Sequence, residues 1–150
     1  MAGLYYDEFT IGMEFRHPLT RTVTEMDNIL FCAMTHNPQP LHLDEEFSKK
    51  TQYGQRIVNS LFTLGLVIGV TVADTTLGTT LGNLGMTDIR FKNPVFHGDT
   101  IHVLTRIKDK RVSKSRPGEG IVTFEHFGYN QRDEEVCYVM RTGLMKMKPA

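Results

Sequence analysis

This chain of 150 residues lacks both a cysteine framework and an excess of charge of either sign. Its two cysteines, Cys32 and Cys137, lie too far apart in sequence for a Cys-x-x-Cys metal or redox motif or for a disulfide framework. Buried free thiols in a reducing cytosol are the expected state of both. Lysine plus arginine and aspartate plus glutamate number 17 each, so there is no overall basic field. We therefore expect no nucleic-acid partner.

A basic leader and a long apolar run are missing too. The first residues show no positively charged segment followed by an apolar one, so no signal peptide is indicated. The longest apolar stretch, residues 61–73, is too short to span a bilayer and is interrupted by glycine and threonine. We expect a cytoplasmic protein with no membrane partner. Its length fits one domain, residues 1–150, with a sizeable core.

Helices are indicated in the first half of the chain. Residues 13–23 have strand character that Pro18 interrupts, and Thr24 then suits a helix N-cap, with Asp27 completing a capping box. That helix must end before the prolines at residues 38 and 40, and residues 43–50 suit a short helical turn. Residues 61–73 are apolar on every face of a helix, which predicts a helix buried on all sides. Gly65 and Gly69 share one face of it and predict the close approach of another backbone.

From about residue 80 the pattern favours strands. Ile101, Val103 and Thr105 alternate with polar residues, which is typical of a half-buried strand. The other strand-like segments are residues 84–91, 121–129 and 136–147, separated by turns or loops at residues 94–100, 114–118 and 131–134. A buried helix followed by an antiparallel meander predicts an α+β fold of the hot-dog type, with the sheet wrapped around one long helix. The far side of that helix also needs cover, so we expect a homodimer or a higher homo-oligomer.

Residues 35–42 are the candidate segment for chemistry, because they hold two histidines, two prolines, an asparagine and a glutamine. The prolines fix φ and remove backbone donors, which predicts a stiff, non-helical segment. Such a segment can hold a reactive imidazole in place, but solvated histidines in a loop that ends a helix give the same pattern. A zinc site from His36, His42 and Asp44 is a weaker interpretation, because the i,i+4 pair of a helical zinc site is missing.

Residues 40–44, which read Pro-Leu-His-Leu-Asp, resemble the motif of the MaoC-like (R)-specific enoyl-CoA hydratase/dehydratase family. That family has Gly-Asp-x-Asn-Pro-Leu-His with an acidic residue two positions on, and a later helix that opens with Val-His-Gly. Residues 94–100 resemble its Pro-Val-x-x-Gly-Asp-Thr turn. The resemblance covers nearly the whole chain in order. It implies a hot-dog fold and a hydro-lyase that adds water reversibly across the double bond of an α,β-unsaturated acyl-CoA.

Four places depart from the family pattern, and the first is His36 at the position of the family's glycine. Asn37 stands where the family has its catalytic aspartate, Gln39 stands where it has asparagine, and residues 58–60 read Val-Asn-Ser. The pattern with these replacements is similar to a branch of the family linked to C5 dicarboxylic acyl thioesters such as mesaconyl-CoA and itaconyl-CoA. The resemblance therefore implies a substrate of that class.

The resemblance also implies roles for single residues. His42 is the expected base, since a histidine ordinarily titrates near neutral pH. Asn37 cannot act as a base and would position the attacking water with its amide. The backbone N–H of Ser60 falls at the family's oxyanion donor, at the start of the buried helix. Gln39 and Asn59 are expected to bind substrate, and Asn59 also suits an N-cap.

Several charged residues remain open to two interpretations. Lys114 and Arg116, in a Gly/Pro loop, are candidates for the phosphates of CoA or simply part of a solvated loop. Arg90 and Arg141 would pair with a substrate carboxylate or form a structural ion pair. His36 is a fallback acid/base, or a structural or solvated histidine. No metal and no cofactor beyond the CoA thioester itself is expected.

Two other functions stay open. Hot-dog proteins include thioesterases, which usually need a carboxylate at the start of the helix, where this chain has Asn59 and Ser60. A catalytically inert acyl-CoA-binding module is the non-enzyme alternative, because Asn37 replaces the expected acid. Loss of the enoyl group, release of free thiol and binding without turnover are the three outcomes that separate these functions.

Overall fold

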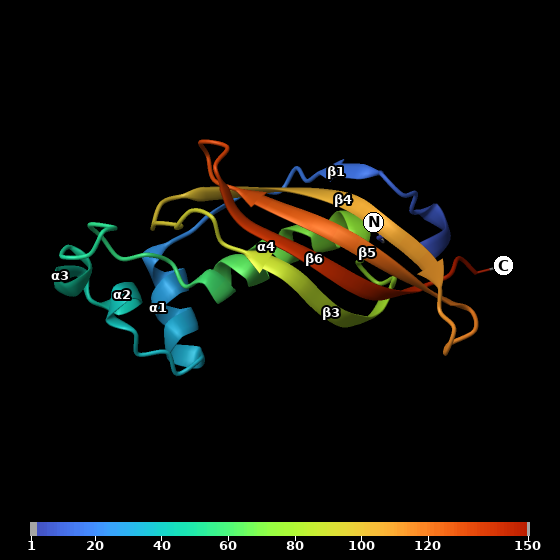
Figure 1. Cartoon of the computed structure of the whole chain (residues 1–150), viewed down its shortest axis with the longest axis horizontal. Coiled ribbons are helices and arrows are strands. Elements are labelled where there is room, and N and C mark those ends of the chain that lie inside the picture. The colour runs from blue at the N-terminus through green and yellow to red at the C-terminus, as the bar shows by residue number, and fades with distance from the viewer. Residues whose placement is uncertain (1–2, 150) are drawn as a thin grey trace.

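A curved antiparallel sheet lies along one long helix, α4 (Ser60–Thr75), in the computed structural model, which describes residues 3–149 (Figure 1). Along the sheet the strands follow the order β1 (Glu14–Arg16), β4 (Thr100–Val112), β5 (Glu119–Tyr129), β6 (Glu135–Lys146) and β3 (Thr80–Arg90). Strand β2 (Arg21–Thr22) also pairs with β4. This is the predicted α+β arrangement of a sheet around a helix. No helix within residues 3–149 is long and apolar enough to cross a membrane.

The expected meander is correct for only three of the strands. β4, β5 and β6 are successive neighbours, but β3 pairs with β6 at the far edge of the sheet and not with β4. The predicted turn at residues 94–100 closes where the N–H of Asp99 donates to the carbonyl of Phe96 at 3.0 Å. It belongs to a connection that passes the start of α4, where the N–H of Val58 donates to the carbonyl of Val95 at 2.8 Å. The connection between β3 and β4 therefore passes next to the start of the long helix at residues 94–99.

Three helices gather beyond the N-terminal end of α4 (Figure 1). The first, α1 (Glu25–Met34), has the predicted capping box, in which Thr24 and Asp27 bond each other's backbone N–H groups at 3.2 and 2.8 Å. The third, α3 (Glu45–Ser48), is the short helical turn predicted within residues 43–50, and α2 (Pro40–Leu43) precedes it. The prediction of a non-helical segment through residue 42 is wrong, because Pro40 begins α2, where its missing N–H removes no bond.

Within one chain α4 is buried on one side only, which corrects the prediction of burial on all sides. Val67 and Val70 face the sheet with at most 3% of their surface exposed, whereas Leu61 is 59% exposed. A Cβ added at Gly65 or Gly69 would meet nothing within 4 Å. The close backbone approach expected at these glycines is therefore not made within the chain, and one face of α4 remains uncovered.

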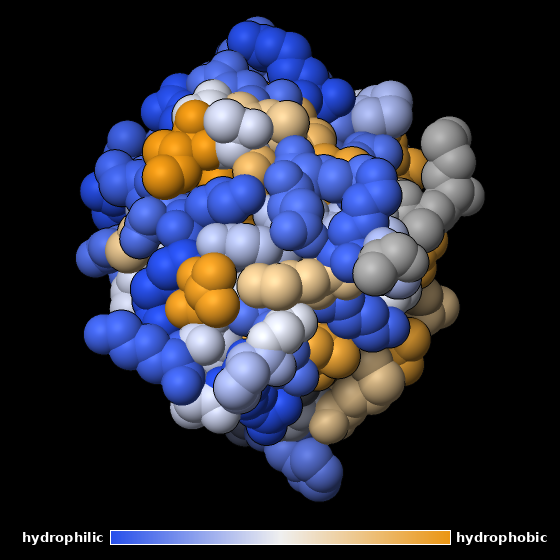
Figure 2. Space-filling model, turned by 90° about the vertical axis from the view of Figure 1, so that its right-hand side faces the viewer, coloured by the Kyte–Doolittle hydropathy of each residue, from blue (hydrophilic) through white to orange (hydrophobic). Residues whose placement is uncertain are grey.

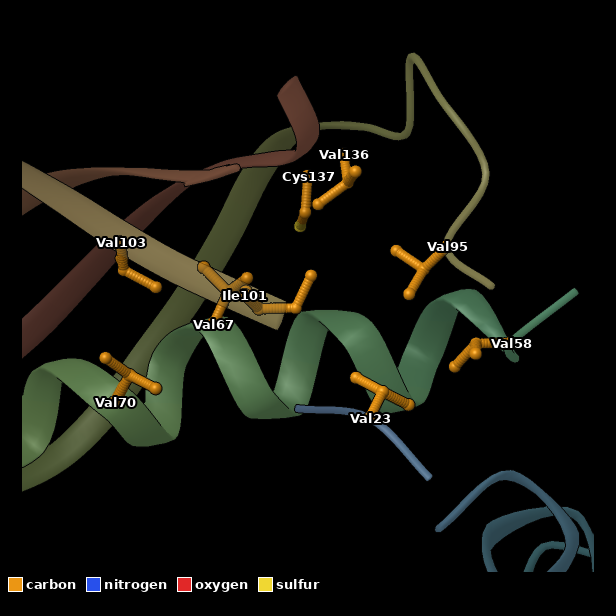
Figure 3. Packing of buried hydrophobic residues seen from close by; sticks show 9 residues of the cluster. All are labelled: Val23, Val58, Val67, Val70, Val95, Ile101, Val103, Val136 and Cys137. Carbon is orange, nitrogen blue, oxygen red and sulfur yellow. The ribbon is translucent and has the colours of Figure 1, made fainter. Parts of the chain in front are cut away.

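The core consists of two apolar clusters, one at each half of the sheet. The first packs between one face of α4 and the sheet, and Figure 3 shows its side chains pointing at one another from helix, strands and loops. Gly128 belongs to this packing, because a Cβ there would lie 2.5 Å from Cγ2 of Val67. The second cluster joins Phe124 and Ile107 to Phe9 and to a short 3-10 helix, η1 (Tyr6–Glu8).

A chain of polar side chains lies between the two clusters on the side of the sheet that faces α4. Arg141 Nε donates to His126 Nε2 at 3.1 Å, and bonds of 2.8 Å then link His126 Nδ1 to Thr105, Thr105 to His17 Nε2, and His17 Nδ1 to Asp74. A guanidinium only donates and a carboxylate only accepts, so both histidines carry their proton on Nδ1. Burial, together with the Arg141 charge, holds the pKa of His126 well below its usual value. Arg141 thus has an internal structural role.

Candidate active site

His42 is held on α2 by the backbone that leads into α4. Its Nδ1 lies 2.9 Å from the carbonyl oxygen of Ile57, and the side chain is half-buried. A carbonyl oxygen only accepts, so Nδ1 carries the proton, and Nε2 of the neutral ring keeps its lone pair for a base role. The N–H of Ile57 donates to the carbonyl of Leu41 at 3.2 Å, which ties α2 to the same strand-like segment. Nε2 of His42 has no hydrogen-bond partner among residues 3–149.

The start of α4 offers a backbone donor that has no partner among residues 3–149, three positions after the Ile57 carbonyl that holds His42. Asn59 is the predicted N-cap, and its Oδ1 accepts from the N–H of Leu61 at 2.9 Å. Its Nδ2 lies 3.8 Å from the sulfur of Cys32, so both ends of the buried amide have partners inside the protein. The N–H of Ser60 donates no hydrogen bond to any of residues 3–149. This N–H, at the positive end of the helix dipole, suits a developing negative charge.

A cavity of about 210 Å³, here called the Ser60 hollow, opens beside the start of α4. Ser60, Thr63 and Tyr53 contribute to its wall, and so do Lys92 and Asn93 from the segment after β3. The remaining lining residues are apolar: Ile57, Val58, Phe91, Pro94, Val95 and Val136. Lys92 is the one charged residue of the lining, and it is paired with Glu135, which lies outside the lining, at 3.4 Å.

Asn37 lies beside a second cavity of about 410 Å³, here called the Asn37 hollow. His36 and Pro38 line it too, and the rest of the lining is mainly apolar: Ile29, Cys32, Ala33 and Leu43. Asn37 Oδ1 accepts from the N–H of Gln39 at 3.0 Å. This bond closes an Asx turn, which fixes the orientation of the Asn37 side-chain amide. His36 is exposed and has φ of 54°, in the left-handed region. Among residues 3–149 no direct hydrogen bond joins Asn37 to His42, and the Gln39 side chain is exposed.

Lys114 and Arg116 are not brought to this site within one chain. They lie in the loop between β4 and β5, at the opposite end of the molecule from α1–α3 (Figure 1). The 13 residues of β4 separate the two ends, a path of about 40 Å at about 3.3 Å per strand residue. Figure 2 views the molecule from that end, where hydrophilic residues predominate. Arg116 pairs there with Glu119 at 3.6 Å, so these two residues form part of a surface loop.

Other polar residues of the site were missed by reasoning from the sequence. Asn28 of α1 is fully buried and bonds four groups around the start of α4. Arg56 bridges Glu25 and Glu45 with two bonds of 2.7 Å. Burial and the Arg56 charge lower the pKa of His97. The available signal was a polar residue, Asn28, within an amphipathic helical window, but its partners lie in distant segments.

Three or more His, Cys, Asp or Glu side chains do not gather as a metal-binding group anywhere in residues 3–149. The described residues therefore give no support to the weaker interpretation of a zinc site at His36, His42 and Asp44. Asp44 instead caps α3, where its Oδ1 accepts from the N–H of Phe47 at 2.9 Å. Asp44 is therefore the N-cap of a short helix.

Comparisons with known proteins agree with this architecture. Residues 8–135 match the family model described as MaoC like domain. Mesaconyl-CoA hydratase from Cereibacter sphaeroides is 27% identical over 98% of this chain, which corresponds to 42% of that protein. The chain thus spans about two fifths of the length of the curated relatives it matches first.

Two solved structures bear on the fold. The monoamine oxidase regulatory protein from Archaeoglobus has a TM-score of 0.87 at 31% identity, with 99% of this chain and 98% of that chain covered. A Mycobacterium tuberculosis protein described as having a double hot-dog fold has a TM-score of 0.87 at 21% identity, with 98% of this chain and 45% of that chain covered. The predicted hot-dog fold is confirmed.

Proposed function

The chain belongs to the MaoC-like domain family, and from that membership we propose that it is an acyl-CoA hydratase/dehydratase. It adds water reversibly across the double bond of an α,β-unsaturated acyl-CoA. The observation that carries the proposal is that one short segment, residues 57–60, both holds the His42 ring and begins α4 with the Ser60 N–H. His42 is fixed on the carbonyl of Ile57 with Nε2 free, and three residues later the Ser60 N–H is unpaired at the start of α4.

The reaction follows from these groups. Water attacks Cβ while His42 Nε2 takes its proton, and the electrons of the double bond move towards the thioester carbonyl. The Ser60 N–H donates to the resulting enolate oxygen. The imidazolium of His42 then gives the proton to Cα, so the elements of water are added and the base is restored. Asn37 orients the attacking water through its amide, and no metal or further cofactor takes part.

The substrate we propose is a C5 dicarboxylic acyl-CoA of the mesaconyl- or itaconyl-CoA type. The Ser60 hollow supports this class, because about 210 Å³ accommodates a short acyl group beside the Ser60 N–H. Lys92 gives the hollow a cation for the second carboxylate, and its present partner, Glu135, is 3.4 Å away. The similar mesaconyl-CoA hydratase supports the same substrate class.

Replacing Lys92 by glutamine should lower kcat/KM for mesaconyl-CoA by about tenfold, the low end for a hydrogen bond to a charged group because Lys92 is exposed. The value for crotonyl-CoA, which has no second carboxylate, should stay within about twofold. Lys108→Gln is the matched control, since Lys108 and Lys92 have similar exposure, 58% and 59%, and each faces a glutamate. Equal losses on both substrates would rule out a carboxylate contact at Lys92.

The uncovered face of α4 and the free edge of the sheet support a homodimer. Leu61 on the helix and Leu84 on β3 are 59% and 54% exposed, and β3 pairs only with β6 within residues 3–149. Exposed apolar residues along an edge strand that has one free side favour association.

Sedimentation should give twice the 17.1 kDa of one chain. Leu84→Glu should shift it towards monomer, whereas Ile11→Glu, 58% exposed near β1, should not; a monomeric wild type would refute the dimer.

The thioesterase alternative lacks support at the start of α4. No acidic residue lies in the first turn of this helix, so neither Asn59 nor Ser60 supplies the carboxylate that a thioesterase would use. The inert-module alternative differs from hydration in its outcome, because a module that only binds acyl-CoA leaves the enoyl group unchanged.

A further inference from the structure

One buried amide, that of Asn28, connects the segment that holds His42 with the start of α4. Asn28 lies on α1 with no exposed surface, and its Oδ1 accepts from the N–H of Asn59 at 2.9 Å. Its Nδ2 lies 3.2 Å from the carbonyl of His42, 3.1 Å from the carbonyl of Ile57 and 3.0 Å from Nε2 of His97. A single side chain thus contacts α2, the segment before α4, the N-cap residue of α4 and the turn after β3.

The orientation of this amide is fixed by its partners. The Asn59 N–H can only donate, so the oxygen of Asn28 must face it, and the NH₂ group must face the two carbonyls. The two hydrogens of that NH₂ group cannot serve three acceptors fully, so the contact of 3.0 Å between Asn28 Nδ2 and His97 Nε2 competes with the bonds to the two carbonyls. The bond to the Asn59 N–H is buried and the other three contacts are part-buried, so the amide is held on both ends by groups of the protein.

This network connects the ring of His42 with the backbone just before Ser60. The carbonyl of Ile57 accepts from both Asn28 Nδ2 and His42 Nδ1, which uses its two lone pairs and fixes the ring that carries the base. On the other side Asn28 Oδ1 fixes the Asn59 N–H, and the next N–H in the chain is that of Ser60. Movement of Asn28 would therefore shift His42 and Ser60 relative to each other.

We propose that Asn28 is a positioning residue for hydration, which sets His42 Nε2 and the Ser60 N–H at the spacing that the reaction needs without touching the substrate. This rests on the proposed function. A misplacement of about 1 Å at reacting atoms costs about 10²-fold in rate, so loss of this tether should act on kcat and leave KM nearly unchanged.

Asn28→Ala and Asn28→Asp test the proposal. The first removes every bond, and the second keeps the acceptor for the Asn59 N–H but replaces the donor to the two carbonyls by an oxygen. We expect kcat to fall about 10- to 100-fold in both, with KM within about threefold, measured on folded protein below the melting transition. Val67→Ala is the control, because it destabilises the buried core near Gly128 and should leave kcat unchanged.

A second readout separates this proposal from the proposed function. Ring ¹⁵N NMR of the wild type should show one His42 tautomer, with the proton on Nδ1, and Asn28→Ala should broaden or average that signal. Changed His42 signals in a protein without hydratase activity would support the tether and refute the function. An active wild type whose Asn28 variants keep full kcat per folded molecule and unchanged His42 signals would overturn the proposal.

Discussion

Replacing His42 by alanine is expected to reduce hydration by about 10³- to 10⁴-fold, close to the limit of detection. General acid–base catalysis by one side chain contributes about 10²- to 10⁴-fold, and here the same nitrogen takes the proton from water and returns it to Cα. The bond from Nδ1 to the carbonyl of Ile57 directs this role to Nε2. The measurement is the steady-state rate of loss of the enoyl absorbance, with circular dichroism as the check that the variant is folded.

Two neighbouring variants serve as controls for this result. His36→Ala should retain activity within about threefold, far from the loss expected for a general base, because His36 is exposed and makes no side-chain bond within residues 3–149. Asn37→Asp should keep measurable activity, since a carboxylate at this position can also orient water. Robust hydration by the His42→Ala enzyme would exclude His42 as the base and leave the mechanism without a proton acceptor.

Replacing Ser60 by proline is expected to lower kcat by about 10²- to 10³-fold, the effect of removing one oxyanion donor. Proline removes the backbone N–H without breaking α4, because Ser60 is the first residue of the helix, where proline is well accepted. The extended backbone of Asn59, with φ of −57° and ψ of 126°, also suits a residue before proline. The melting temperature should therefore stay close to that of the wild type.

Ser60→Ala is the matched variant for this experiment. It removes the hydroxyl but keeps the N–H, so its kcat should lie within about threefold of the wild type, far from the loss that removal of an oxyanion donor causes. If both variants lost the same activity, the hydroxyl would be the functional group. If Ser60→Pro kept full kcat while folded, the start of α4 would not stabilise the enolate.

The parts of the fold that depend on local sequence could be predicted. Thr24 and Asp27 form the predicted capping box, and Asn59 caps the long helix as its residue type suggests. The β4–β6 strands follow from the alternation of apolar and polar residues. The partner of β3 could not be predicted, because strand pairing across the sheet depends on long-range packing that no local pattern contains. The helical turn at Pro40 was missed because proline also begins helices.

Candidate site residues that belong to a local sequence motif could be predicted, whereas those that depend on contacts between distant segments could not. His42 and Ser60 were identified by motif, and the structure links them through Ile57. Lys114 and Arg116 were chosen from the composition of their loop, but the length of β4 takes that loop to the other end of the sheet. Asn28 was missed because its importance lies in contacts with residues 14 to 69 positions away.

The most direct test of the proposed hydratase is to incubate the wild-type protein with mesaconyl-CoA, itaconyl-CoA and crotonyl-CoA while following enoyl absorbance and free thiol together. We predict that the enoyl absorbance of a C5 dicarboxylic substrate falls with no release of thiol, and that it falls faster than that of crotonyl-CoA. Release of free thiol would identify a thioesterase, and binding without any change in absorbance would identify an inert module. Either of these two results would contradict the proposed hydration chemistry.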